Sequence, residues 1–229
     1  MLNLVQSVQS GVKTFFMMCI TPLMKVSFTG TNDMDSRNLI DHYKYWRDDA
    51  IRADLDNKRF DYSVVCCNIG NDFNIATVIR NANAFLAKEV VIYGNKKYDR
   101  RGTAGTHHYT NFKHVKSVDN LFDYVLALRN GIGIDTEQYK ERREVRLLAV
   151  DNVNDAMDVN TYEFDPTVYY VFIFGQEQIG IPQEVLDIAD DIIYIPQYGS
   201  VRSINVGTAS GIVMNTYCAA VSTTPGLRV

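Results

Sequence analysis

The sequence lacks the local motifs that mark several common nucleotide and metal sites. Its four cysteines include no C-x-x-C pair, so we expect neither a zinc ribbon nor a redox dithiol. It contains no G-x-G-x-x-G after the first apolar run, no G-x-x-x-x-G-K-[ST] and no G-x-S-x-G. These absences argue against a dinucleotide dehydrogenase, a P-loop NTPase and an α/β-hydrolase. Adjacent histidines, His107 and His108, would point to opposite faces of a strand, so we predict no metal site.

A long apolar run and an excess of positive charge are also missing. The apolar stretch 15–24 contains Pro22 and is too short to cross a bilayer. No Lys or Arg occurs in residues 1–12, which disfavours a secretory signal. We therefore expect a cytoplasmic protein with no membrane partner. The net charge of −4 argues against wrapping nucleic acid over the whole surface but allows local basic clusters. One such cluster contains Lys96, Lys97, Arg100 and Arg101.

The chain has 229 residues, 46% of them hydrophobic, which suits one domain with a small appendage. Leu39, Tyr43, Trp46 and Ala50 recur at helical spacing, so we predict an amphipathic helix over about 33–57. The sequence thus divides into an N-terminal extension, 1–60, and a domain at 61–229.

Strand-like and helix-like segments alternate from residue 60 onward. Short apolar or β-branched runs occupy 62–67, 90–92, 145–150, 168–174 and 192–195. Helical patterns follow at about 74–86, 119–127, 182–189 and 206–220. This alternation predicts an α/β fold with a mostly parallel sheet flanked by helices.

Three polar segments follow apolar runs, where an α/β sheet forms its ligand site. Arg80 lies opposite the apolar stripe of its helix, in a segment rich in asparagine. On its own it would be a solvated arginine, but a helix start with nearby amides can also hold a phosphate or a ribose. Glu177 lies between Gly175 and Gly180. It is equally well explained as an exposed turn residue or as part of a site where the glycines let the backbone approach a ligand closely. Asn205 is a good cap for the last helix.

Together the three segments resemble the SpoU/TrmH family of S-adenosylmethionine-dependent RNA 2′-O-ribose methyltransferases, in the SPOUT superfamily. The resemblance rests on Asn68-x-x-Asn71 with Arg80 and Ala82, on Phe174-Gly175-x-Glu177-x-x-Gly180, and on Ile195-Pro196 through Gly199, Ser203, Asn205 and Ala209. Their order and spacing agree with the family over about residues 62–220.

This resemblance implies a C-terminal deep trefoil knot, a homodimer, S-adenosylmethionine as cofactor and tRNA or rRNA as substrate. It implies catalytic roles for a set of polar residues: Asn71, Arg80, Glu177, Ser203 and Asn205. It implies that the cofactor lies against a second set: Gly175, Ile195, Ile204, Ala149 and Gln197. RNA is expected near Arg80, Lys96, Lys97, Arg100 and Arg101.

Two alternatives stay open at this point. The chain could be a non-catalytic RNA-binding protein with the same fold, although the presence of all the catalytic-position residues argues against this. It could also be a knotted methyltransferase that acts on another RNA atom, such as a base nitrogen.

Overall fold

The computed structural model describes residues 36–67, 72–131, 144–176 and 179–222. Its centre is a parallel sheet of seven strands in the order β3-β2-β1-β6-β4-β7-β5. The strands are β1 (Tyr62–Cys67), β2 (Glu89–Tyr93), β3 (Phe112–Val115), β4 (Val145–Val150), β5 (Met157–Asp158), β6 (Tyr169–Phe174) and β7 (Asp191–Tyr194). The α/β fold with a mostly parallel sheet is therefore confirmed.

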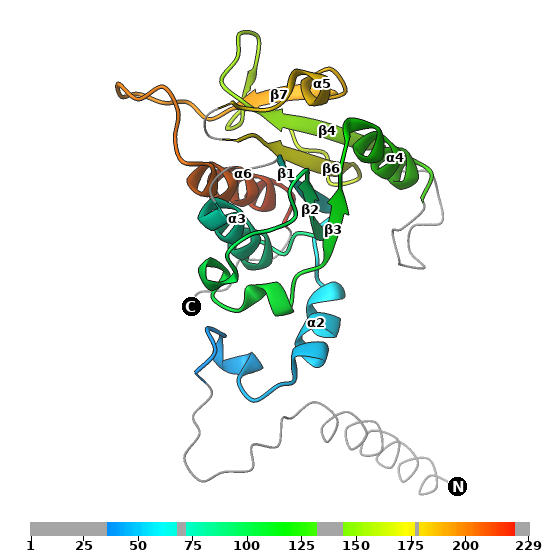
Figure 1. The fold of residues 1–229 in the computed structure, drawn as a ribbon, viewed down its shortest axis with the longest axis vertical. Coiled ribbons are helices and arrows are strands. Elements are labelled where there is room, and N and C mark those ends of the chain that lie inside the picture. Colours follow the sequence, from blue (N-terminus) through cyan, green and yellow to red (C-terminus); the bar gives the residue numbers. More distant parts are fainter. Residues whose placement is uncertain (1–35, 68–71, 132–143, 177–178, 223–229) are drawn as a thin grey trace, which may run out of the picture.

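Helices cover both faces of this sheet (Figure 1). They are α3 (Asp72–Ala84) and α6 (Val206–Val221) on one face, and α4 (Val118–Arg129) and α5 (Gln183–Leu186) on the other. Helix α2 (Asp48–Asp56) covers neither face and packs with Tyr43 and Tyr109 in a separate small cluster. Three short 3-10 helices, η1 (Asp41–Tyr43), η2 (Arg100–Thr103) and η3 (Thr106–His108), complete the described elements. The helix predicted over 182–189 is shorter than expected, and Pro182 is its N-cap.

Side chains alternate between the two faces of each central strand. In β1, Val64 and Cys66 join an apolar cluster with α3 and α6, whereas Val65 and Cys67 join a second cluster with α4. Both faces of a sheet covered by helices must be apolar, which explains why β1 and β6 are buried along their whole length. The sheet is thus the middle layer of three.

The single helix predicted over about 33–57 is wrong as an uninterrupted element. Its residues from 36 onward form η1 and α2, separated by a turn in which Tyr45 has a left-handed backbone with φ 67°. Arg37 holds this turn by donating to the carbonyl of Trp46 at 2.8 Å and pairing with Asp48 at 2.7 Å. Apolar side chains on both sides of the turn therefore pack into one small cluster with Tyr109.

This N-terminal segment is attached to the domain by a buried arginine. Arg59 donates to the backbone carbonyls of Ala87 at 3.0 Å and Tyr109 at 2.6 Å, and its Nε bonds Asp56 at 2.6 Å. A buried guanidinium costs free energy unless its donors are satisfied. These three bonds fix the segment against the chain around η3.

Candidate functional site

A cavity of about 130 Å³ lies at the carboxyl edge of the sheet. Chain segments that leave β4, β6 and β7 meet there with the first turn of α6. The lining residues are Val150, Asp151, Asn152, Phe174, Gly175, Gln176, Gly180, Ile195, Gln197, Ser203, Ile204, Val206 and Ala209. Ligands of open α/β sheets bind at this edge, beyond the carboxyl ends of the strands.

A tight turn after β6 forms one wall of the cavity. Gln176 and Gly180 exchange backbone hydrogen bonds of 2.9 and 2.7 Å, and Gly180 has φ 76°. A Cβ on Gly175 would overlap the carbonyl carbon of Gly180 and lie 2.6 Å from the nitrogen of Ile181. Gly175 is therefore needed because the two arms of the turn pack against each other.

Asn205 joins the start of α6 to α3. Its Oδ1 accepts from the amides of Gly207 at 2.8 Å and Thr208 at 3.3 Å, so the predicted N-cap is confirmed. Its Nδ2 donates to Oδ1 of Asn74 at 2.9 Å. Asn74 is 5% exposed, and its own Nδ2 has no hydrogen-bond partner among the described residues. Asn74 was not predicted as a site residue, although the cluster of asparagines around it was the available signal.

Arg80 lies on the exposed side of α3, as its helical position predicted. No hydrogen bond or ion pair joins its guanidinium to the described part of the chain, and Arg80 does not line the cavity. The next residue, Asn81, donates to the carbonyl of Gly207 at 2.7 Å and to Oγ of Ser210 at 3.0 Å. This contact fixes α3 against α6 immediately beside Arg80.

The structure brings together four of the five residues predicted to contact the cofactor. Gly175, Ile195, Ile204 and Gln197 line the cavity, together with the predicted catalytic residue Ser203. Ala149 does not line it: it is fully buried in the apolar cluster on the α4 side of the sheet. Asn71 and Glu177 lie outside the described residues. The roles assigned to these residues stay predictions.

The chemistry of the cavity fits a purine nucleoside with a charged tail. Apolar surfaces from Ile195, Ile204 and Val206 can contact a base. The buried Oε1 of Gln197 has no hydrogen-bond partner among the described residues and can accept from a ligand donor, which offsets the cost of its burial. Asp151 supplies a carboxylate. S-adenosylmethionine, which offers a base, an amino group and positive charge, matches these three features.

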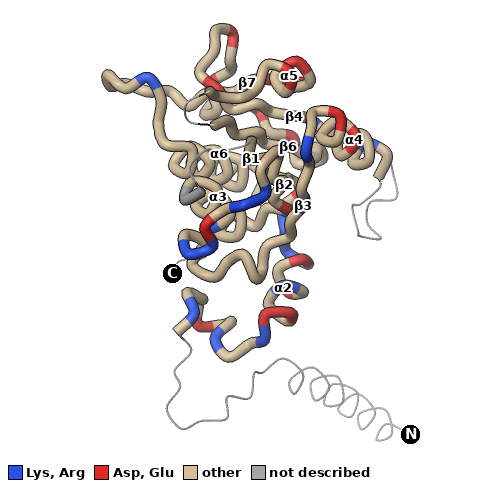
Figure 2. The backbone as a smooth tube through the Cα atoms, in the orientation of Figure 1, with Lys and Arg blue, Asp and Glu red and all other residues tan. Residues whose placement is uncertain are grey.

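The predicted RNA-contact residues other than Arg80 lie between β2 and η3, and η2 packs against α3. Figure 2 shows the blue basic stretches of this segment beside α3. Lys96, Lys97, Arg100 and Arg101 are all exposed, but Arg101 is paired with Asp99 at 2.6 Å. The positive charge of this cluster therefore comes mainly from the other three.

His107 and His108 do not lie in a strand, contrary to the sequence analysis. Both belong to η3, with ring centroids 4.1 Å apart. Nδ1 of His107 lies 2.7 Å from Oγ1 of Thr103, and burial lowers the pKa of His107. The described residues contain no group of three His, Cys, Asp or Glu side chains that could hold a metal ion.

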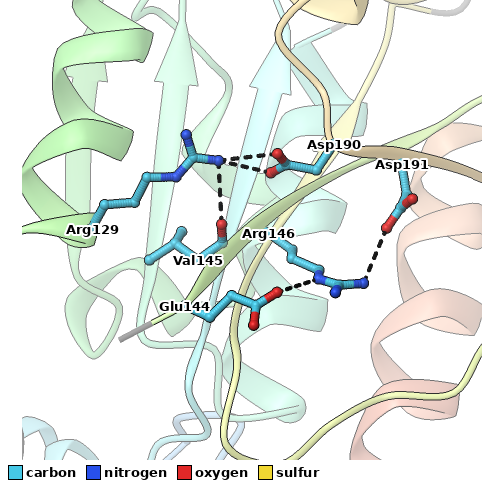
Figure 3. A pocket seen from close by; sticks show the side chains of 6 residues that line it. All are labelled: Arg129, Glu144, Val145, Arg146, Asp190 and Asp191. Atoms are coloured by element: carbon cyan, nitrogen blue, oxygen red, sulfur yellow. Dashed lines mark hydrogen bonds and ion pairs between the residues drawn. The ribbon is translucent and has the colours of Figure 1, made fainter. Parts of the chain in front are cut away.

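A larger cavity, about 520 Å³, opens at the opposite, amino edge of the sheet. Figure 3 shows that its charged side chains face one another. Arg129 pairs with Asp190 at 2.9 Å, and Arg146 pairs with Glu144 at 2.7 Å and Asp191 at 3.6 Å. Because these charges are paired within the cavity itself, the arrangement ties β4, β7 and α4 together and offers little to a ligand.

Comparisons with known proteins agree with the geometry. The model of the SpoU rRNA Methylase family matches residues 61–215. A tRNA (guanosine(18)-2′-O)-methyltransferase of Aquifex aeolicus is 28% identical over 168 residues, covering 72% of each chain. The enzyme of the same name from Escherichia coli is 27% identical over 160 residues, covering 70% of this chain and 64% of its own. The matched part is thus less than two thirds of the E. coli protein.

Two solved structures support the fold. The A. aeolicus TrmH/SpoU tRNA modifying enzyme superposes with a TM-score of 0.61 at 24% identity, covering 76% of this chain and 82% of that one. The SpoU methyltransferase AviRb from Streptomyces viridochromogenes, in complex with AdoMet, superposes with a TM-score of 0.59 at 24% identity, covering 70% and 58%. In the part of the chain that the structure describes, no helix is long and apolar enough to cross a membrane. The family match extends over most of the chain and contains every residue that lines the carboxyl-edge cavity, so the chain belongs to the SpoU rRNA methylase family, as its motifs predicted.

Proposed function

We propose that the protein transfers a methyl group from S-adenosylmethionine to a ribose 2′-hydroxyl of tRNA. The observation that carries this proposal is the carboxyl-edge cavity, where the segments after β4, β6 and β7 meet beside the helix that bears Arg80. The family match and the names of the related tRNA methyltransferases support the reaction and the RNA class.

The cofactor supplies an electrophilic methyl group on a sulfonium. The ribose oxygen forms the new bond to carbon, the sulfur keeps the electron pair of the broken bond, and the hydroxyl proton leaves. The protein must therefore align oxygen, carbon and sulfur and stabilise the oxygen as it loses its proton.

Arg80 suits the second task. A guanidinium stays protonated in proteins, so Arg80 cannot serve as the base in its usual state. It can bind the phosphate next to the target ribose and stabilise the developing alkoxide. The proton then passes to water. Arg80 is exposed on α3 without a partner among the described residues, which leaves its donors available for RNA.

Ser203 and the Asn205–Asn74 pair would orient the ribose. Ser203 lines the cavity, and Asn205 is fixed by two amides of α6 and by Asn74. We also assign Asn71 and Glu177 to this site, on the resemblance alone. A polar side chain fixed in this way contributes orientation without losing further freedom when the substrate binds.

We further propose the family's deep trefoil knot in the chain from β6 to α6, and a homodimer. Exposed apolar side chains support a partner near the cavity: Ile179 is 75% exposed, Tyr198 96% and Val201 61%. Apolar groups gathered at a surface commonly mark an interface. Because tRNA is the proposed substrate, we place the enzyme in the cytoplasm.

The test is methyl transfer to unmodified total RNA. Labelled S-adenosylmethionine, purified protein and RNA are incubated, and the RNA is separated by size. Label in the tRNA band supports the proposal, and label confined to the large RNA bands would instead identify a ribosomal substrate. If no RNA is labelled although the cofactor binds, the chain is a non-catalytic RNA-binding member of the fold.

A further inference from the structure

Asp151 is the only charged side chain among the described residues that line the carboxyl-edge cavity. It follows the last residue of β4, and its backbone nitrogen donates to the carbonyl of Ile193 at 3.1 Å. The backbone at Asp151 is thus fixed by the sheet itself. None of the three sequence motifs includes this residue.

The carboxylate of Asp151 lies next to the turn that follows β6. Its Oδ2 would be 3.3 Å from a Cβ built on Gly180, and its Oδ1 accepts from the amide of Asn152 at 2.8 Å. No Lys or Arg of the described chain comes within ion-pairing distance of it. A partly buried carboxylate without a cation is costly, so a positively charged ligand would be stabilised at this place.

The neighbouring residue connects Asp151 to the other wall of the cavity. Nδ2 of Asn152 donates to the carbonyl of Arg202 at 3.2 Å, in the loop that leads to Ser203. Asp151 is therefore held between the turn after β6 and the loop after β7. The carboxylate contributes a fixed negative charge to the cavity, so a ligand's affinity should depend on its net charge.

The two cofactor forms differ in charge. S-adenosylmethionine carries a sulfonium, an ammonium and a carboxylate, and so has a net positive charge. S-adenosylhomocysteine has lost the sulfonium charge with the methyl group and is neutral overall. We propose that Asp151 makes this cavity selective for the positively charged cofactor over its neutral product. The inference rests on the proposed cofactor and adds to it a charge-based preference that favours exchange of product for fresh cofactor.

The test compares the affinities of the two ligands by isothermal titration calorimetry, without RNA. Asp151→Asn keeps the shape and the acceptor oxygen but removes the charge. Loss of a charge interaction across a few ångströms at an effective dielectric near 20 weakens binding on the order of tenfold or more. We expect that loss for S-adenosylmethionine and a change several times smaller for S-adenosylhomocysteine. Raising the salt concentration should reduce the ratio of the wild-type affinities for S-adenosylmethionine and S-adenosylhomocysteine. The same ratio should change less in Asp151→Asn.

Asp155→Asn is the matched control. Asp155 is exposed in the same loop and does not line the cavity, and asparagine tolerates its left-handed backbone, φ 67°. The affinities of Asp155→Asn for both ligands should equal those of the wild type. Equal weakening of both ligands by Asp151→Asn, or no weakening, would overturn the inference while leaving the proposed function intact. Failure of the wild-type protein to bind either ligand would instead contradict the proposed cofactor site and the inference with it.

Discussion

Gly175 shows how a single residue shapes the carboxyl-edge cavity. The space where its side chain would point is occupied by the backbone of Gly180 and Ile181. The chain can leave β6 and return in five residues only because neither arm carries a side chain at this contact. A turn of this kind places backbone, rather than side chains, against a bound ligand.

Gly175→Ala should therefore destabilise the protein. The added methyl group overlaps backbone atoms that cannot rotate away, and overpacking of this kind costs about 1–3 kcal/mol. Gly199→Ala is the control, because a Cβ there meets no atom within 4 Å. Denaturant unfolding of both variants checks the prediction. Equal stabilities would show that the turn opens without cost.

Single residues also show which features of the site could be predicted from the sequence. The cap at Asn205 and the exposed position of Arg80 followed from local pattern. Asn74 did not, because its partner Asn205 is 131 residues away in the chain. Asp151 was missed for the same reason: its importance comes from cavity walls that distant segments build around it.

Among the elements, the packing of α6 on α3 connects the cavity to Arg80. A Cβ on Gly207 would lie 2.7 Å from Cγ2 of Thr77, so the helices approach closely where Asn81 bonds the Gly207 carbonyl. Asn205 begins α6 at this contact and fixes its first turn.

We predict that Asn205→Ala lowers the free energy of unfolding by about 1 kcal/mol, the usual cost of losing an N-cap. Asn205→Asp should lose less, because a carboxylate accepts from the same two amides and is favoured at a helix N-terminus. The carboxylate cannot donate to Asn74, but the Asn74 amide can rotate so that its unpartnered Nδ2 donates to the carboxylate instead. Chemical denaturation distinguishes the two variants. If both lose the same stability, the cap is not what holds the first turn of α6.

The N-terminal element shows where pattern fails. Leu39, Tyr43 and Trp46 have helical spacing, yet the chain turns at Tyr45. The same apolar side chains can pack together across a bend in the backbone when another side chain, here Tyr109, packs between them. The spacing of apolar residues shows which side chains will be buried. Tertiary contacts decide whether the backbone between them stays helical. Strand β3 was missed because it is an edge strand that is mostly exposed, and its sequence, FKHV, contains no apolar run.

For the molecule as a whole, the parallel sheet followed from the alternation of strands and helices, but the strand order did not. Strand β6 lies between β1 and β4, a placement set by long-range pairing that no local pattern specifies. The knot expected from the family has the same origin. Charge, by contrast, is visible in both sequence and structure: an acidic chain carries a basic segment beside α3.

Replacing Lys96 and Arg100 together by Glu should weaken RNA binding and reduce the steepness of its salt dependence. Each lost phosphate contact lowers the slope of log affinity against log salt by roughly one. The control reverses Lys44 and Arg47, charges in the N-terminal segment that are paired with Asp41 and Asp49. Filter binding over a series of salt concentrations measures the RNA affinity and its salt dependence for both double variants. An unchanged slope in the first variant would mean that RNA binds elsewhere.

The central claim is 2′-O-methyl transfer assisted by Arg80, and one measurement tests it most directly. Wild-type protein and Arg80→Ala are incubated with labelled S-adenosylmethionine and unmodified tRNA, and the product is digested with alkali. We predict label in fragments that resist cleavage, since a 2′-O-methyl group blocks the adjoining phosphodiester. The variant should lose transfer by at least about 100-fold while its affinity for the cofactor, measured by calorimetry, stays the same. Label released as single nucleotides, or full transfer by Arg80→Ala, would contradict the account.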